Sequence, residues 1–232
     1  MKHFIILIVF AIGFNAQAQN NKELLEHYQA YYKQMKSQSD IQGIINGLTH
    51  LNVLSPSVAR QDTLAYIYMN EGKFIQAINT VGVDENSSDS DMAVEVKAMS
   101  LKALSQPKLA IPQFETLFKR TQNVALSYEL AELYLQTQNL TEASKNVEYG
   151  LLHAQDNMGK KFYESQQPYQ VPLKAAFLYL KGLIVFNENK ETNIDLAVSY
   201  LEQALTMAPN FNLAFVSRQA LLGQKPQPKT ED

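Results

Sequence analysis

The stretch Asn123–Leu152, NVALSYELAELYLQTQNLTEASKNVEYGLL, carries the clearest secondary-structure signal in the chain. In its first half, residues at helical spacing share one face: Ser127, Leu130, Ala131 and Tyr134. Its second half does the same with Ala143, Val147, Gly150 and Leu151. Between them lies a predicted turn at Asn139, with Thr141 as the expected helix cap. The stretch therefore predicts two amphipathic helices, and because neither can bury its face alone, it predicts neighbours of the same kind.

The same pattern recurs along the chain at a constant spacing. The interval from Ala143 back to Ala110 leads again to Ala77 and then to Ile44, and each of these residues is small or aliphatic. The same steps from Val147 reach large apolar residues: Phe114, Val81 and Leu48. A fifth copy follows at Ala197, but its distance from Ala143 exceeds one step, so a segment is inserted before it. The sequence thus predicts an array of helical hairpins.

This pattern resembles the tetratricopeptide repeat, a unit of about 34 residues with small residues, a Tyr, an Ala and a closing Pro at fixed offsets. The best matches are Leu64-Ala65-Tyr68 with Ala77, Leu130-Ala131-Tyr134 with Ala143, and Gly182 with Ala197, Ala204 and Pro209. Two copies depart from the pattern, since Tyr32 stands where a small residue is usual and Lys97 where Leu is usual. The resemblance implies an all-α, right-handed superhelical solenoid of about five hairpins; the alternative is an unrelated all-helical bundle.

The segment 1–18 has the composition of a secretory signal peptide. A basic start at Lys2 precedes an apolar run from Phe4 to Phe14, and Ala16-Gln17-Ala18 forms a small-x-small cleavage site. The chain contains no cysteine, which excludes disulfides and a lipid anchor built on Cys. We therefore expect a soluble exported protein, periplasmic or secreted, that begins at Gln19.

The repeats predict the organisation of the mature chain. We expect repeats at about 25–57, 58–90, 91–123, 124–153 and 173–210, an insertion at 154–172, a capping helix at 211–222 beginning after Asn210, and a disordered tail at 223–232. Pro112 predicts a delayed start for the second helix of the third repeat. In the capping helix, Arg218 and Gln219 fit a polar outer face.

Composition and motifs argue against catalysis, cofactors and metals. The formal net charge of −3 becomes −4 without Lys2, and no basic cluster favours nucleic acid. The chain has no glycine-rich phosphate loop, paired-His metal motif or Ser nucleophile elbow, and the mature histidines, His27, His50 and His153, are far apart in sequence. The acidic run Asp84–Asp91 does not match an EF-hand, so we expect a solvated turn in which Ser90 or Asp91 caps the next helix.

The resemblance implies that partners contact the first helix of each hairpin. By the repeat register the predicted inner face comprises Gln29, Lys33, Lys36, Asp62, Tyr66, Met69, Asn70, Glu95, Met99, Lys102, Tyr128, Glu132, Gln136, Tyr179, Leu183 and Phe186. The basic clamp by which chaperone-binding members hold a C-terminal carboxylate is not matched, since Met92 and Val96 stand where its third-helix basic pair would be. We therefore expect recognition through the side chains of Tyr66, Met99, Tyr128 and Phe186.

The insertion carries three aromatic residues, Phe162, Tyr163 and Tyr169, and two interpretations of it stay open. It folds back on the chain's own groove, or it grips a partner. The leading functional hypothesis is a non-catalytic scaffold that binds a protein or peptide. The alternative is a carrier for a small envelope ligand, such as a glycan or peptidoglycan fragment, enclosed by the insertion. A third, an enzyme with an unrecognised site, requires two of His27, His50, Glu132 and Asp62 to converge.

Overall fold

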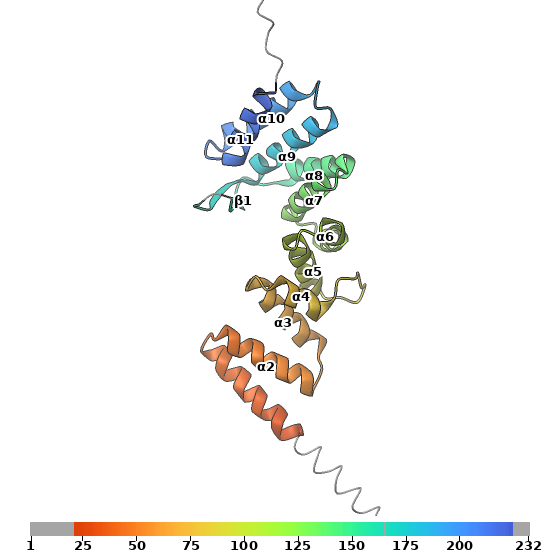
Figure 1. Ribbon diagram of the computed structural model, residues 1–232, viewed down its shortest axis with the longest axis vertical. Helices are drawn as coiled ribbons and strands as arrows, with labels where there is room; N and C mark the ends of the chain where they lie inside the picture. The colour runs from red at the N-terminus through yellow and green to blue at the C-terminus, as the bar shows by residue number, and fades with distance from the viewer. Residues whose placement is uncertain (1–20, 165, 225–232) are drawn as a thin grey trace, which may run out of the picture. The chain divides into compact units, whose positions relative to one another are not determined.

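The computed structural model describes residues 21–164 and 166–224. Contacts divide the chain into two compact units, an N-terminal unit that ends at Leu104 and a C-terminal unit that begins at Ser105. In both, consecutive helices pack against one another (Figure 1). The predicted signal peptide, residues 1–18, and residues 225–232 of the predicted tail lie outside the described residues. The all-α prediction is confirmed.

The N-terminal unit is helical from residue 21 to residue 37 and then contains α2 (Ile41–Leu54), α3 (Val58–Asn70), α4 (Phe74–Val81) and α5 (Asp91–Ala103). Polar caps start two of these helices. The carboxylate of Asp40 accepts from the Gly43 amide at 2.9 Å, and the hydroxyl of Ser90 accepts from the Ala93 amide at 3.1 Å. Apolar residues of neighbouring helices form its core, among them Ile44, Ile45, Leu48, Leu64, Ala65, Ala77 and Val96.

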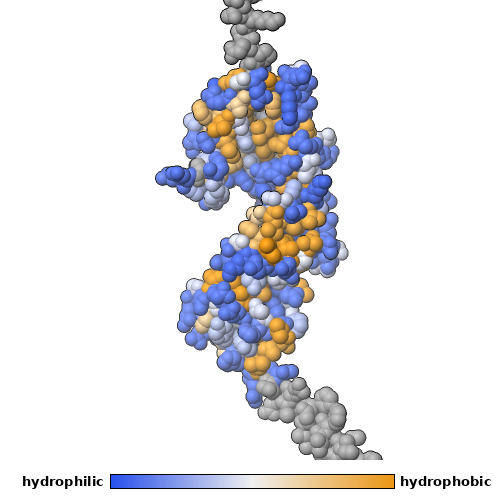
Figure 2. All heavy atoms as spheres, in the orientation of Figure 1, coloured by the Kyte–Doolittle hydropathy of each residue, from blue (hydrophilic) through white to orange (hydrophobic). Residues whose placement is uncertain are grey.

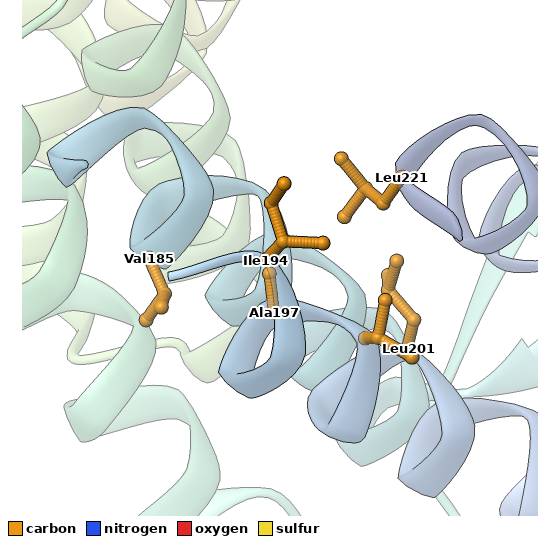
Figure 3. Close-up of a cluster of buried hydrophobic side chains, with 6 residues drawn as sticks. Val185, Ile194, Ala197, Leu201 and Leu221 are labelled. Carbon is orange, nitrogen blue, oxygen red and sulfur yellow. The ribbon is translucent and has the colours of Figure 1, made fainter. Parts of the chain in front are cut away.

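The C-terminal unit contains α6 (Pro107–Thr121), α7 (Val124–Gln136), α8 (Leu140–His153), β1 (Gly159–Phe162), β2 (Tyr169–Pro172), α9 (Leu173–Glu188), α10 (Ile194–Met207) and α11 (Asn212–Leu222). Figure 3 shows one of its core clusters, where side chains of α9, α10 and α11 meet: Val185, Ile194, Ala197, Leu201 and Leu221. The close approach of α10 to α9 favours a glycine, because a Cβ on Gly182 would lie 3.0 Å from the carbonyl oxygen of Ala197.

The backbone repeats with the period predicted from the sequence. In four hairpin turns the residue with positive φ is Ser39, Gly72, Ser105 or Gln138, and one repeat period separates each from the next. This left-handed conformation reverses the chain at the end of each first helix. Only Gly72 adopts it without a steric penalty from a Cβ atom. The turn geometry therefore follows the repeat even where the residue type does not.

Three predicted helix starts are wrong in detail. Helix α6 begins at Pro107 and continues through Pro112, so its start is not delayed. Proline suits the first position of a helix, where its missing N–H would have no partner, and Pro112 forfeits only one internal bond. The cap of α8 is Asn139 rather than Thr141, with its side chain accepting from the Glu142 amide, and α11 is preceded by Phe211 rather than Asn210.

The outer face of α11 is less polar than predicted. Arg218 is partly buried and donates to Glu202 at 3.0 Å, whereas Phe215 and Val216 are about half exposed. No helix among residues 21–164 and 166–224 is both long enough and apolar enough to span a bilayer.

The insertion forms an antiparallel β-hairpin, whereas the sequence predicted a loop. Strands β1 and β2 pair in the register Gly159 with Pro172 and Phe162 with Tyr169. The hairpin projects beside α9 (Figure 1), and Figure 2 shows hydrophilic residues at its projecting end. Two strands alone are marginally stable in water, so this hairpin depends on the helices it contacts.

Candidate functional site

In the N-terminal unit, the first helices α3 and α5 pack side by side. The hydroxyl of Ser90, the cap of α5, donates to the carboxylate of Asp62 on α3 at 2.7 Å. This bond aligns the amino-terminal halves of the two helices. The predicted stripe that follows Asp62 along α3 therefore runs beside the stripe that begins at Glu95 on α5.

Three apolar residues of these stripes are accessible to solvent. Tyr66 and Met69 are half-buried on α3, and Met99 on α5 has 42% of its surface exposed. We name Tyr66, Met69 and Met99 the N-terminal face. Polar residues flank it: Asn70 and Glu95 are exposed, and Lys102 is half-buried. The face thus combines adaptable apolar side chains with a polar rim, which is a composition typical of binding surfaces.

The prediction that Asp62 lies on an open face is wrong. Only 7% of its surface is exposed, because Ser90 lies over its carboxylate. The bond ties the segment 82–90 to α3, and Asp62 is therefore a structural residue.

A second buried polar residue fastens the same segment. Lys97 is 2% exposed, and its Nζ lies 2.5 Å from Asp89 Oδ2 and 2.7 Å from the carbonyl oxygen of Asp84. This explains why a lysine stands where the repeat usually has leucine. The acidic run is held in place by the ammonium group, and Ser90 caps α5 as expected.

Gln29, Lys33 and Lys36, the predicted face of the first repeat, are exposed on the helical segment 21–37. On the same segment, Tyr28 stacks on the ring of His50 at 4.1 Å and meets His27 edge-on at 5.4 Å. Both histidines therefore contact an aromatic ring.

In the C-terminal unit, the hairpin covers the first helix α7. Tyr128 is fully buried, with its ring 6.4 Å from that of Phe162 in β1 and 5.6 Å from that of Phe177 in α9. Phe162 is itself 8% exposed. The prediction that Tyr128 lines an open face is wrong, because Phe162 of the hairpin packs on its ring.

Further aromatic contacts hold the hairpin against α11. Phe162 stacks on Tyr169 at 5.7 Å and lies 5.0 Å from Phe211, which precedes α11. Phe211 also lies 5.2 Å from Tyr179 on α9. The hydroxyl of Tyr169 accepts from the Leu213 amide at 3.5 Å. The hairpin therefore folds back on its own unit, as the first interpretation of the insertion held.

Charge reinforces this contact at α7. Lys160 of β1 is paired with Glu129, and its Nζ lies 4.6 Å from the centre of the Tyr128 ring. Burial, and then the nearby carboxylates of Glu132 and Glu129, raises the pKa of Tyr128 well above its ordinary value. In the described residues, the hydroxyl of Tyr128 has no hydrogen-bond partner. This position is closed and holds an unsatisfied polar group.

The neighbouring tyrosines are more accessible. Tyr169 is half-buried, and burial together with a hydrogen bond to Glu164 raises its pKa to about 12. Burial also raises the pKa of Tyr179, although a hydrogen bond from Ser217 opposes that rise. Glu132 and Leu183 are half-buried, Gln136 is exposed, and Phe186 packs against the cluster of Figure 3. Tyr163, near the hairpin end, is 70% exposed.

The sequence offered two signals for this arrangement that its period alone could not interpret. The aromatic residues Phe162 and Tyr169 in the insertion indicated a segment with apolar surface to bury. Lys97 at an apolar position of the repeat indicated a buried charge that needs a partner. The partners, Asp89 and Asp84, lie in the acidic segment just before it.

No protein-family model and no curated protein sequence matches the chain. Solved structures do. YrrB, described as a TPR protein with an unusual peptide-binding site, aligns with a TM-score of 0.66 at 14% identity over 89% of this chain and 97% of that one. A tetratricopeptide repeat protein from Parabacteroides merdae gives 0.60 at 16% identity over 88% and 73%. MamA gives 0.58 at 16% identity over 89% and 100%.

The repeat period, the hairpin turns and these alignments agree with one another. The chain has the tetratricopeptide repeat fold.

Proposed function

We propose that the chain is an exported, non-catalytic scaffold that binds a protein or peptide on the N-terminal face. The observation that carries this proposal is the solvent-accessible surface of three residues on the adjacent helices α3 and α5. Met99 is exposed, and Tyr66 and Met69 are half-buried because part of each side chain packs on the core. Methionine and tyrosine bury large apolar areas on binding, and methionine adapts its shape to the partner. The description of YrrB as a protein with a peptide-binding site supports the same use of the fold.

Polar residues at the edge of this face define the partner further. Glu95 and Lys102 on α5 carry opposite charges, and Asn70 supplies an amide. A partner that inserts apolar side chains between mixed polar groups fits such a rim better than a strongly charged ligand does. We infer an amphipathic peptide or helix whose apolar residues contact the N-terminal face.

The alternative of an enclosed small ligand is not favoured. An enclosed ligand requires a hairpin that closes over an open groove, but Phe162 and Lys160 of the hairpin themselves contact Tyr128. The position where a ligand was expected is occupied by the chain's own side chains.

Affinity capture from cell-envelope extract tests the proposal. A variant with Tyr66→Ala, Met69→Ala and Met99→Ala should lose at least about tenfold in partner recovery, because truncation of a few central anchors removes most binding energy. The matched control is Val53→Ala, Val58→Ala and Ile75→Ala, which truncates three exposed apolar residues of the same unit outside this face. Equal recovery by both variants, with unchanged helical circular dichroism, would refute the proposal.

Export is proposed separately and has its own test. The composition of residues 1–18 supports cleavage after Ala18. Mass spectrometry of the protein from fractionated cells should find a mature N-terminus at Gln19 in the envelope or medium. An intact Met1 in the cytosol would contradict it.

A further inference from the structure

A hollow of about 370 Å³ lies among α2, α3 and α4 of the N-terminal unit. Its volume falls in the range of small-ligand sites, roughly 300–1,000 Å³. It is lined by Gln42, Ile45, Asn46, Thr49, His50, Tyr68, Lys73 and Gln76. It shares no residue with the N-terminal face, so an inference from it is independent of the proposed function.

Hydrogen bonds fix the polarity of this hollow. Lys73 Nζ donates to Gln42 Oε1 at 3.4 Å, and Gln42 Nε2 donates to Asn46 Oδ1 at 2.9 Å. The amide oxygens of Gln42 and Asn46 are therefore both used as acceptors. These two bonds leave several donors to meet a ligand: the other N–H groups of Lys73, the second N–H of Gln42 and the Nδ2 of Asn46.

The charges of the lining residues also favour a ligand that accepts hydrogen bonds. None of the eight lining residues is Asp or Glu, and Lys73 supplies a positive charge. The hydroxyl of Thr49 donates to the carbonyl oxygen of Ile45 at 2.8 Å, so Thr49 adds no donor to those of Lys73 and Asn46. A ligand that accepts hydrogen bonds and carries one negative charge complements this set of groups.

The other lining residues suit a small organic group that is attached to the negatively charged group of the ligand. Ile45 is 3% exposed and forms an apolar base, and Tyr68 contributes a half-buried ring. His50 is held by its stack on Tyr28, with the rings 4.1 Å apart and 15° from parallel. This stack holds the ring of His50 in place before a ligand binds, which lowers the entropic cost of binding at that wall.

We propose that this hollow binds a carboxylate group, with Lys73 and Asn46 as its donors. A single ammonium group with one amide matches the single charge of a carboxylate, whereas a phosphate dianion would leave charge uncompensated. The carboxylate comes from a peptide, either from its C-terminus or from an acidic side chain.

Nuclear magnetic resonance titration of the purified protein tests this with matched probes. N-acetyltyrosine carries a terminal carboxylate, and N-acetyltyrosine amide has the same body without the charge. N-acetylaspartic acid α-amide carries only a side-chain carboxylate. We expect at least one acid to shift the amide signals of Gln42–His50 and Lys73–Gln76, with the neutral amide about tenfold weaker or worse. The stronger acid identifies the source of the carboxylate.

Two variants assign the effect to the proposed donors. Lys73→Gln keeps a donor for Gln42 but removes the charge, and Asn46→Asp replaces the free donor with an anion; both should weaken the acid probe about tenfold or more. Lys36→Gln removes the same charge from an exposed residue outside the hollow and should change binding less than about twofold. Equal binding of acid and amide, no shift at these residues, or equal losses in Lys73→Gln and Lys36→Gln would overturn the proposal.

Discussion

Asp62 in the N-terminal unit and Tyr128 in the C-terminal unit occupy the same position of the repeat, two repeat periods apart. Both are buried, and each is covered by a connecting segment longer than a tight turn. The segment 82–90 covers Asp62 through polar contacts, with Ser90 on Asp62 and Asp89 on Lys97. The hairpin covers Tyr128 through aromatic contacts. The same repeat position is therefore buried in both units, through polar contacts in the N-terminal unit and aromatic contacts in the C-terminal unit.

The difference lies in how much of each unit's inner face is covered. The polar segment covers Asp62 through Ser90, and Tyr66, Met69 and Met99 keep solvent-accessible surface. The hairpin joins α7 to the start of α11 through Phe162 and Phe211 and crosses beside α9. The hairpin therefore buries Tyr128 of the predicted face, whereas Tyr66, Met69 and Met99 of the N-terminal unit keep solvent-accessible surface.

The largest expected effect is the removal of the hairpin's aromatic anchor. Phe162→Ala should lower the free energy of unfolding by about 3–5 kcal/mol, because Phe162 is buried and contacts three other rings. Denaturant unfolding followed by circular dichroism measures this loss. Tyr163→Ala, at the exposed neighbour, should stay within about 0.5 kcal/mol of the parent. Equal effects would show that the hairpin does not pack as described.

Loss of the contacts that hold the polar segment should lower the free energy of unfolding by a smaller amount. Lys97→Ala should cost about 2 kcal/mol, because it leaves the partly buried Asp89 without its cation. Hydrogen exchange should locate the change at the amides of residues 84–90. Lys22→Ala removes a lysine from the exposed pair with Glu26, at 3.9 Å, and should cost well under about 1 kcal/mol. If exchange in 84–90 stays unchanged in Lys97→Ala, Lys97 does not fasten the segment.

At Tyr128, a substitution should raise the stability of the protein instead of lowering it. Tyr128→Phe should stabilise the protein by about 1 kcal/mol, because it removes a buried hydroxyl that has no partner and keeps the ring contacts. The same unfolding measurement checks it, with Tyr66→Phe at a half-buried position as the control. A loss of stability in Tyr128→Phe would reveal a hydrogen bond that the hydroxyl makes in solution.

Alkaline pH should weaken the C-terminal unit. The pKa of Tyr128 is raised on folding, first by burial, and that of Tyr169 is raised to about 12. Below the unfolded pKa, near 10, both states are protonated and stability is complete; above it the unfolded state ionises first, so stability falls as pH rises towards 12. Unfolding midpoints at pH 9 to 12 should decline, and less so in Tyr128→Phe. A decline of the same size in the variant would assign it to other groups.

Much of the fold followed from the sequence because one period organises it. The constant spacing of the repeats predicted the hairpins, and the positive-φ turns at Ser39, Gly72, Ser105 and Gln138 recur with it. A period says which residues share a helix face, and it predicts exposure only where the connections are short. Tyr128 is covered by Phe162 and Asp62 by Ser90, which are contacts between residues distant in sequence.

The hairpin itself could not be predicted from local preference. Strands as short as β1 and β2 are marginal alone, and Gly159 and Pro172 at their ends are poor strand formers. Its stability comes from Tyr128 and Phe211, which belong to other parts of the unit. The repeat register accordingly placed Asp62 and Tyr128 on an open face, whereas connecting segments cover both residues.

Hydroxyl-radical footprinting of the native protein, read by mass spectrometry, tests the central comparison without mutation. We predict rapid oxidation of Met99, Tyr66 and Tyr163, and protection of Tyr128 and Phe162 that disappears when urea unfolds the chain. If Tyr128 were oxidised in the folded protein as fast as Tyr66, the hairpin would not close the C-terminal unit's face, and the account would be contradicted.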